Sequence, residues 1–201
     1  MAIKAHEFDG QRWQTALPDV AVIAGDEPYF KVKLGDHWRA CGRSTGFEDR
    51  VVIDQSDNGF TAKLADEMDS LSLFSSRTLV EVRLARGRLD GESRQILGQW
   101  IASPPPDKRL LISGPNLDAS EQKTDWLATL DRQGQVIDSI PVPAYQFQQW
   151  LQATLRTAGL RLSADALAAA TAHTEGNLLA VGQLIERLKM IQPDLLAGDV
   201  L

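Results

Sequence analysis

The 201-residue sequence has only one cysteine, Cys41, which excludes an intrachain disulfide and a four-cysteine zinc site. We expect Cys41 to be a buried structural residue. No stretch approaches the roughly 20 apolar residues of a membrane span. Residues 1–4 are followed by acidic side chains rather than by the apolar run of a signal peptide. The sequence therefore predicts a soluble protein of a reduced compartment, cytoplasmic and without a membrane association.

An excess of basic residues is also lacking. Lysine and arginine number 21 against 27 aspartates and glutamates, giving a net charge of -6. Binding to a phosphate backbone normally needs a basic surface, so no strong autonomous DNA binding is expected. The remaining composition, 43% apolar and 24% charged, is that of a globular protein with a substantial core.

The nucleotide-binding motif of many parallel α/β proteins is missing. A phosphate-binding loop needs two glycines followed by Lys and Ser or Thr, but the turn after residues 20–24 holds only Gly25. Asp26 and Glu27 stand where phosphates would bind, and Pro28 suits the first position of a helix. Residues 109–113 are not followed by the acidic pair that could hold magnesium. We expect no bound nucleotide and no other cofactor.

Catalytic and metal-ligating patterns are absent as well. His6, His37 and His173 are scattered, and neither a metalloprotease motif nor a nucleophile elbow occurs. Solvated or capping roles fit these histidines. Trp100, Trp126 and Trp150 lie on apolar faces of predicted helices and are expected to pack in the core or between domains. The sequence predicts no catalytic residue and no metal site.

Strands and helices alternate over the first two thirds of the chain. Continuous apolar strands are predicted at 20–24, 50–54, 78–84, 109–113 and 135–140, and helices at 29–43, 61–70, 92–102 and 120–131. This alternation predicts an α/β domain with a doubly wound parallel five-stranded sheet.

The pattern changes at Pro141-Val142-Pro143, which favours an extended linker. Helices are predicted beyond it at 144–158, 163–174 and 177–191, with Gly159 as a C-cap and Ser163 as an N-cap. We therefore expect two domains, an α/β domain at 1–142 and a small three-helix domain at 143–201.

One apolar segment stands apart from this pattern. Phe60, Leu64 and Met68 already give the helix at 61–70 an apolar stripe, yet Leu71-Ser72-Leu73-Phe74 follow it directly, and then two serines. These residues could pack back against the helix. Alternatively, an exposed Leu-Phe pair is the kind of anchor that carries most of the energy of a protein interface.

Three motifs in this order and spacing resemble the delta subunit of the bacterial DNA polymerase III clamp loader. They are Ala24-Gly25-Asp26-Glu27-Pro28, Leu71-Ser72-Leu73-Phe74-Ser75-Ser76-Arg77 with the strand after it, and Glu175-Gly176-Asn177-Leu178-Leu179-Ala180. The resemblance implies an AAA+-like first domain without ATP binding and a small helical lid domain. It also implies that Leu71, Ser72, Leu73 and Phe74 bind the beta sliding clamp, with Leu73 and Phe74 as the plug.

The resemblance further implies a non-catalytic role in DNA replication, in which binding energy shifts the clamp ring toward an open state. The family has a third, helical collar domain through which delta joins the gamma/tau and delta prime subunits, and this sequence ends before it. Two alternatives remain: an AAA+ ATPase with an atypical nucleotide site, and an interaction module with a different partner.

Overall fold

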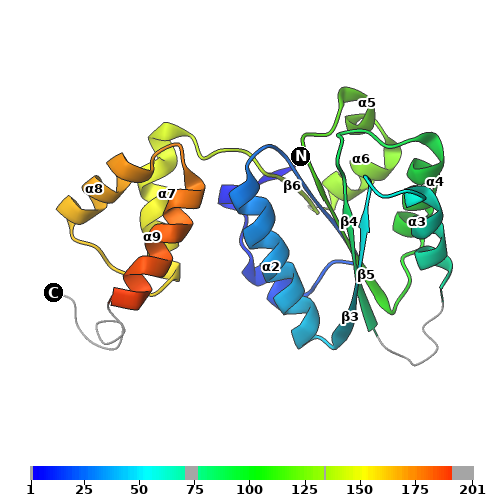
Figure 1. The fold of residues 1–201 in the computed structure, drawn as a ribbon, viewed down its shortest axis with the longest axis horizontal. Coiled ribbons are helices and arrows are strands. Elements are labelled where there is room, and N and C mark those ends of the chain that lie inside the picture. Colours follow the sequence, from blue (N-terminus) through cyan, green and yellow to red (C-terminus); the bar gives the residue numbers. More distant parts are fainter. Residues whose placement is uncertain (1, 71–76, 134, 192–201) are drawn as a thin grey trace. The chain divides into compact units, whose positions relative to one another are not determined.

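The computed structural model describes residues 2–70, 77–133 and 135–191. The chain divides into two compact units, Met1–Ile140 and Pro141–Leu201. Figure 1 shows their elements along the chain, from the α/β part to helices α7, α8 and α9. That residues 1–142 and 143–201 are separate domains with separate roles stays a prediction.

The first unit is built on one sheet, in which every neighbouring pair of described strands is parallel. The strand order is β1-β6-β2-β5-β4-β3. In chain order the strands are β1 (Ile3–Lys4), β2 (Val20–Ala24), β3 (Phe47–Asp54), β4 (Arg77–Arg83), β5 (Lys108–Gly114) and β6 (Val136–Asp138). The predicted doubly wound parallel α/β fold is confirmed.

The predicted number of strands, five, is wrong. The described residues contain a sixth, β1, in which Ile3 pairs with Ile137 and Lys4 with Asp138. Two residues are too few to produce a recognisable apolar run, so this edge strand gave no pattern in the sequence.

Helices cover both faces of the sheet because the strands are apolar on both sides. Helix α2 (Pro28–Ser44) lies on one face, next to α1 (Gln11–Thr15). The other face carries α3 (Phe60–Asp69), α4 (Gly91–Ala102) and α6 (Asp125–Arg132), as Figure 1 shows. A short 3-10 helix (Ala5–Glu7) and helix α5 (Ala119–Gln122) complete this unit as described.

The helix predicted over residues 120–131 is in fact two helices, α5 and α6. Thr124 separates them in an extended conformation, and its hydroxyl donates to the carbonyl of Glu121. The Glu121 side chain is fully buried against Arg94 of α4 and accepts a hydrogen bond from the backbone amide of Leu89. These long-range contacts fix α5 separately, and a local helical pattern does not reveal them.

Several predicted core residues are confirmed. Trp100 and Trp126 are buried, as are the stripe residues Phe60 and Leu64 of α3, while Met68 packs against the same core at its edge. Cys41 is buried too, and burial raises the pKa of its thiol above the ordinary value. A buried thiol that resists ionisation is a poor nucleophile, which agrees with a structural role.

The second unit consists, as described, of α7 (Ala144–Thr157), α8 (Ala164–Thr174) and α9 (Leu178–Ile191). Gly159 adopts a left-handed conformation with φ of 79° after α7. The Ser163 hydroxyl accepts a hydrogen bond from the amide of Ala166 at the start of α8. Both predicted caps are confirmed. Trp150 of α7 is half-buried with its ring centroid 5.7 Å from that of Phe147.

Within the part of the chain that the structure describes, no helix is long and apolar enough to cross a membrane. The same residues contain no group of three or more His, Cys, Asp or Glu side chains that could hold a metal ion.

Candidate functional site

The turn after β2, where a nucleotide would bind in a parallel α/β sheet, is closed by the protein's own groups. The Glu27 carboxylate accepts a hydrogen bond from the amide of Tyr29 at 3.0 Å and so caps α2, and Pro28 occupies the first turn. The Glu27 amide donates to the carbonyl of Ser139 at 2.9 Å, and the Ser139 hydroxyl donates back to the carbonyl of Glu27 at 2.6 Å. These backbone groups are already paired, as the sequence predicted for a structural helix start.

Lys31 adds a positive charge to this turn, but its amine faces the protein's own carbonyls. Its Nζ atom donates to the carbonyl of Gly25 at 2.8 Å and lies 3.5 Å from that of Gly114. The Asn116 side chain donates to the Asp26 carboxylate across the same turn. A phosphate would have to displace these contacts and approach two acidic side chains, which is electrostatically unfavourable.

The segment predicted to bind a partner, Leu71, Ser72, Leu73 and Phe74, lies outside the described residues. The structure does describe its two borders. Helix α3 ends at Asp69, with Ser70 in an extended conformation after it, and the chain continues at Arg77, the first residue of β4. The segment therefore connects α3 to the amino-terminal end of β4.

The border before the segment is held by a buried lysine of β5. Lys108 is 2% exposed, and its Nζ atom lies 3.0 Å from the Glu67 carboxylate and 2.7 Å from the Ser70 hydroxyl. The same amine donates to the backbone carbonyl of Glu67 in the last turn of α3. A cation suits this position, because helix carbonyls near a C-terminus lack intrahelical partners.

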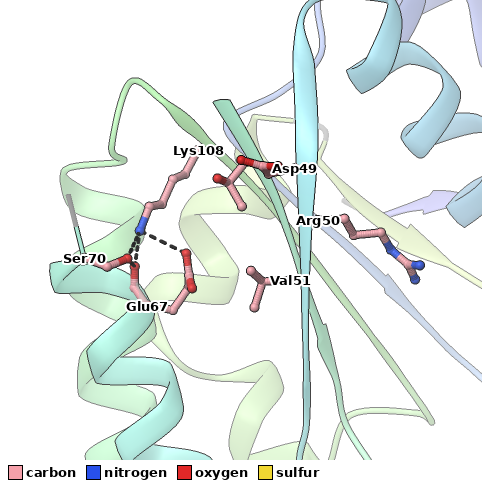
Figure 2. Close-up of a pocket in the computed structure, with 7 residues that line it drawn as sticks. Asp49, Arg50, Val51, Glu67, Ser70 and Lys108 are labelled. Carbon is pink, nitrogen blue, oxygen red and sulfur yellow. Dashed lines mark hydrogen bonds and ion pairs between the residues drawn. The ribbon is translucent and has the colours of Figure 1, made fainter. Parts of the chain in front are cut away.

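A pocket of about 330 Å³ adjoins this contact. Its described lining comes from β3, the end of α3 and the first residues of β4 and β5, namely Asp49, Val51, Glu67, Ser70, Thr78 and Lys108, with Arg50 at its margin. Figure 2 shows Lys108 reaching Glu67 and Ser70 on one side of β3, while the Arg50 side chain points away on the other. Six of the seven described lining residues have polar or charged side chains, and the pocket lies beside the borders of the 71–76 segment.

The border after the segment is held by aromatic and backbone contacts. The Arg77 guanidinium lies 5.5 Å from the ring centroid of Phe47 and donates to the carbonyl of Thr45 at 3.1 Å. Arg109 stacks on the same ring at 4.8 Å. Phe47 begins β3 and is 3% exposed, so this border is joined to the sheet.

Glu81 of β4 ties the same strands to α2 on the opposite face. Its buried carboxylate accepts hydrogen bonds from Arg50 at 2.7 and 3.0 Å and from Arg39 of α2 at 3.1 Å to both oxygens. Burial alone raises the pKa of a carboxyl group, but the two arginines more than offset it and hold the pKa of Glu81 below its ordinary value. Glu81 is therefore ionised at neutral pH, and its ion pairs join β4 to β3 and α2.

Comparison with known proteins identifies the family. The family model for the DNA polymerase III delta subunit matches residues 22–139, which include the closed turn and both borders of the 71–76 segment. The chain belongs to this delta-subunit family.

Two curated delta-family relatives are similar over most of this chain. The DNA polymerase III subunit delta of Escherichia coli is 25% identical over 174 residues, covering 86% of this chain and 50% of the relative. That of Haemophilus influenzae is 21% identical over 181 residues, covering 89% of this chain and 52% of the relative. The chain thus spans about half the length of the curated delta subunits that it matches.

Solved structures agree with the delta-family fold. The Bacillus subtilis DNA clamp loader delta protein superposes with a TM-score of 0.69 at 17% identity, covering 92% of this chain and 57% of that one. A Thermotoga maritima RuvB mutant superposes with a TM-score of 0.50 at 12% identity, covering 94% of this chain and 66% of that one. At these identities the likeness concerns the fold alone.

Sequence reasoning about this delta-family chain missed the contact between Lys108 and the end of α3. The only local signal was a charged residue directly before an apolar strand, which usually indicates an exposed strand end. The oxygens that Lys108 contacts lie 38 and 41 positions earlier in the chain. Only the fold brings them together.

Proposed function

We propose that this chain is a non-catalytic clamp-loader delta subunit that binds the beta sliding clamp through Leu71, Ser72, Leu73 and Phe74. Leu73 and Phe74 are the anchors that enter an apolar pocket on the clamp. Membership of the delta-subunit family is the observation that carries the proposal. The fixed borders of the 71–76 segment support it, since a short connection between anchored ends loses less conformational entropy on binding.

Clamp opening in this proposal needs no chemical step. If the segment binds a distorted ring more tightly than a closed one, the difference in affinity shifts the ring toward the open form. The closed turn after β2 supports a subunit that contributes binding energy rather than ATP hydrolysis, because its backbone groups and Lys31 are already paired. The other proposed partners are the gamma/tau and delta prime subunits, through a collar domain. A cytoplasmic location also stays a prediction.

The decisive experiment measures binding of the chain to the purified beta clamp, with the Leu73→Ala/Phe74→Ala double variant beside it. Loss of two hot-spot anchors should weaken affinity by at least about 30-fold. The matched control is Val32→Ala, because Val32 is a 60% exposed apolar residue on α2, away from the segment. If the folded double variant bound the clamp as tightly as the natural chain, the proposed site would be refuted.

Two further measurements separate the alternatives. Release of the clamp from closed circular DNA by the chain would indicate ring opening, whereas binding without release would restrict the role to capture. Calorimetric titration with magnesium-ATP tests the AAA+ ATPase alternative. Binding of magnesium-ATP at micromolar concentration would support that alternative, although the groups of the turn are paired with one another.

A further inference from the structure

Lys108 contacts the border before the 71–76 segment and belongs to the strand that pairs with the border after it, although it lies about 30 residues beyond the segment in the chain. Its side chain holds the border before the segment through Glu67 and Ser70. Its backbone lies opposite Thr78 in the β4–β5 ladder, and the amide of Thr78 donates to the carbonyl of Asp107 at 2.8 Å. The Lys108 side chain therefore joins the end of α3 to the strand that pairs with the start of β4.

A charge at this buried position needs a reason, because an apolar side chain of similar size could fill the space without desolvation. The amine is matched by the Glu67 carboxylate, the Ser70 hydroxyl and the Glu67 carbonyl, all at the last turn of α3. These three oxygens fix both the distance and the orientation of the end of α3 relative to the Lys108 amine. Apolar packing is less directional than such an ion pair with hydrogen bonds.

We propose that Lys108 is a positioning residue for clamp binding: its side chain holds the end of α3, the border before the 71–76 segment, against the strand that pairs with β4, and so favours clamp binding without touching the clamp. The inference rests on the proposed function. A buried amine that is 2% exposed cannot reach a partner across the surface, so its effect on affinity has to pass through Glu67 and Ser70. Preorganisation raises the fraction of molecules competent to bind, and apparent affinity changes by that fraction.

The test replaces Lys108 by methionine, which keeps the length of the side chain and removes the charge. We expect clamp affinity to fall about tenfold, within the usual range of coupling between sites. Amide hydrogens in the last turn of α3, including that of Ser70, which donates to the carbonyl of Asp66 at 2.9 Å, should exchange faster. Lys108→Arg should recover most of the affinity, because the adjoining pocket of about 330 Å³ has room for the larger group.

The matched control is Lys63→Met. Lys63 lies on α3, the helix whose end Lys108 contacts, and also pairs with a carboxylate, that of Asp57 at 2.9 Å, but its side chain is 51% exposed and its partner precedes α3. Lys63→Met removes a lysine charge without touching the contact between β5 and the end of α3. We expect its clamp affinity to stay within about twofold of that of the natural chain.

The outcomes separate this inference from the proposed function. Unchanged affinity in a folded Lys108→Met variant whose α3 amides exchange faster would overturn the positioning role while leaving the clamp site intact. Equal losses in the Lys63→Met control would also overturn it. No clamp binding by the natural chain would reject both proposals. If Lys108→Met does not fold, the Glu67→Gln/Ser70→Ala variant keeps Lys108 and removes two of its side-chain partners. Unchanged clamp affinity of that double variant would equally refute the inference.

Discussion

Replacing Glu81 by glutamine tests how strongly the buried carboxylate fastens β4 to α2 and β3. Glu81 accepts four hydrogen bonds from Arg39 and Arg50, and its side chain is 5% exposed. Glutamine keeps the shape but loses the charge and can accept through only one oxygen. The two guanidinium groups would then face an amide instead of a carboxylate.

The expected cost follows from the geometry. Breaking a buried ion pair from one side costs about 3–5 kcal/mol, because the remaining charge stays buried. Here Arg50 is 40% exposed and can regain water, whereas Arg39 is 19% exposed and cannot do so fully. We therefore expect Glu81→Gln to lower the free energy of unfolding by about 2–3 kcal/mol at pH 7.

The pH dependence gives this prediction a distinct signature. The folded pKa of Glu81 lies below the unfolded value, so its stabilisation is complete above about pH 4.3 and is lost as the pH falls through the folded pKa. The difference in stability between the natural chain and Glu81→Gln should thus be constant from pH 7 to about pH 5 and shrink at more acidic pH.

The assay is urea unfolding followed by tryptophan fluorescence, repeated from pH 7 to about pH 2.5. Glu48→Gln is the control, since Glu48 is an exposed glutamate of the neighbouring strand β3 and its replacement should change stability by no more than about 0.5 kcal/mol. A loss in Glu81→Gln that is as large at the acidic end as at pH 7 would refute the electrostatic reasoning.

Substitutions at three further positions test other parts of the fold by thermal and urea unfolding. Gly25→Ala should cost about 3 kcal/mol, because Gly25 has φ of 144° and an added Cβ would lie 2.2 Å from the carbonyl oxygen of Ser139; a neutral result would contradict the tightness of the turn. Ser163→Ala should cost about 1 kcal/mol through the lost cap of α8, and Ser163→Asn, which can still cap, should cost much less. Asp138→Asn should raise the free energy of unfolding by about 0.5 kcal/mol at pH 7, because burial and then the charge of Asp131 raise the pKa of Asp138. This advantage should vanish as the pH falls through that pKa. A variant that is less stable than the natural chain at pH 7 would show that the charge is needed.

The parts of the fold that were predictable from sequence are those with a strong local pattern. Residues 20–24 are apolar throughout and all buried, so the predicted strand and β2 coincide. The stripe of Phe60 and Leu64 placed α3 correctly, and Pro28 marked the start of α2. In each case a single segment carries both the apolar pattern and its boundary.

The site contacts could not be predicted in this way, because they depend on the pairing of distant strands. Glu81 lies in an apolar strand, and its partner Arg39 is 42 positions away. Lys108 directly precedes the predicted strand 109–113, and it is buried against α3. A charged residue next to an apolar run has the same local signature whether it is solvated or paired, and only the sheet order distinguishes the two.

The turn after β2 and the borders of the 71–76 segment lie at opposite ends of the strands of this sheet. The turn holding Gly25 and Lys31 follows the carboxyl end of β2, where ligands of open α/β sheets usually bind, and it is occupied by the chain's own groups. The 71–76 segment instead precedes the amino-terminal end of β4, beside the first residues of β3 and β5. Fixed ends lower the conformational entropy that a short connection loses on binding a partner, which is the reasoning behind the proposed clamp site. If the 71–76 segment binds the clamp as proposed, changes at the turn should affect stability far more than clamp affinity.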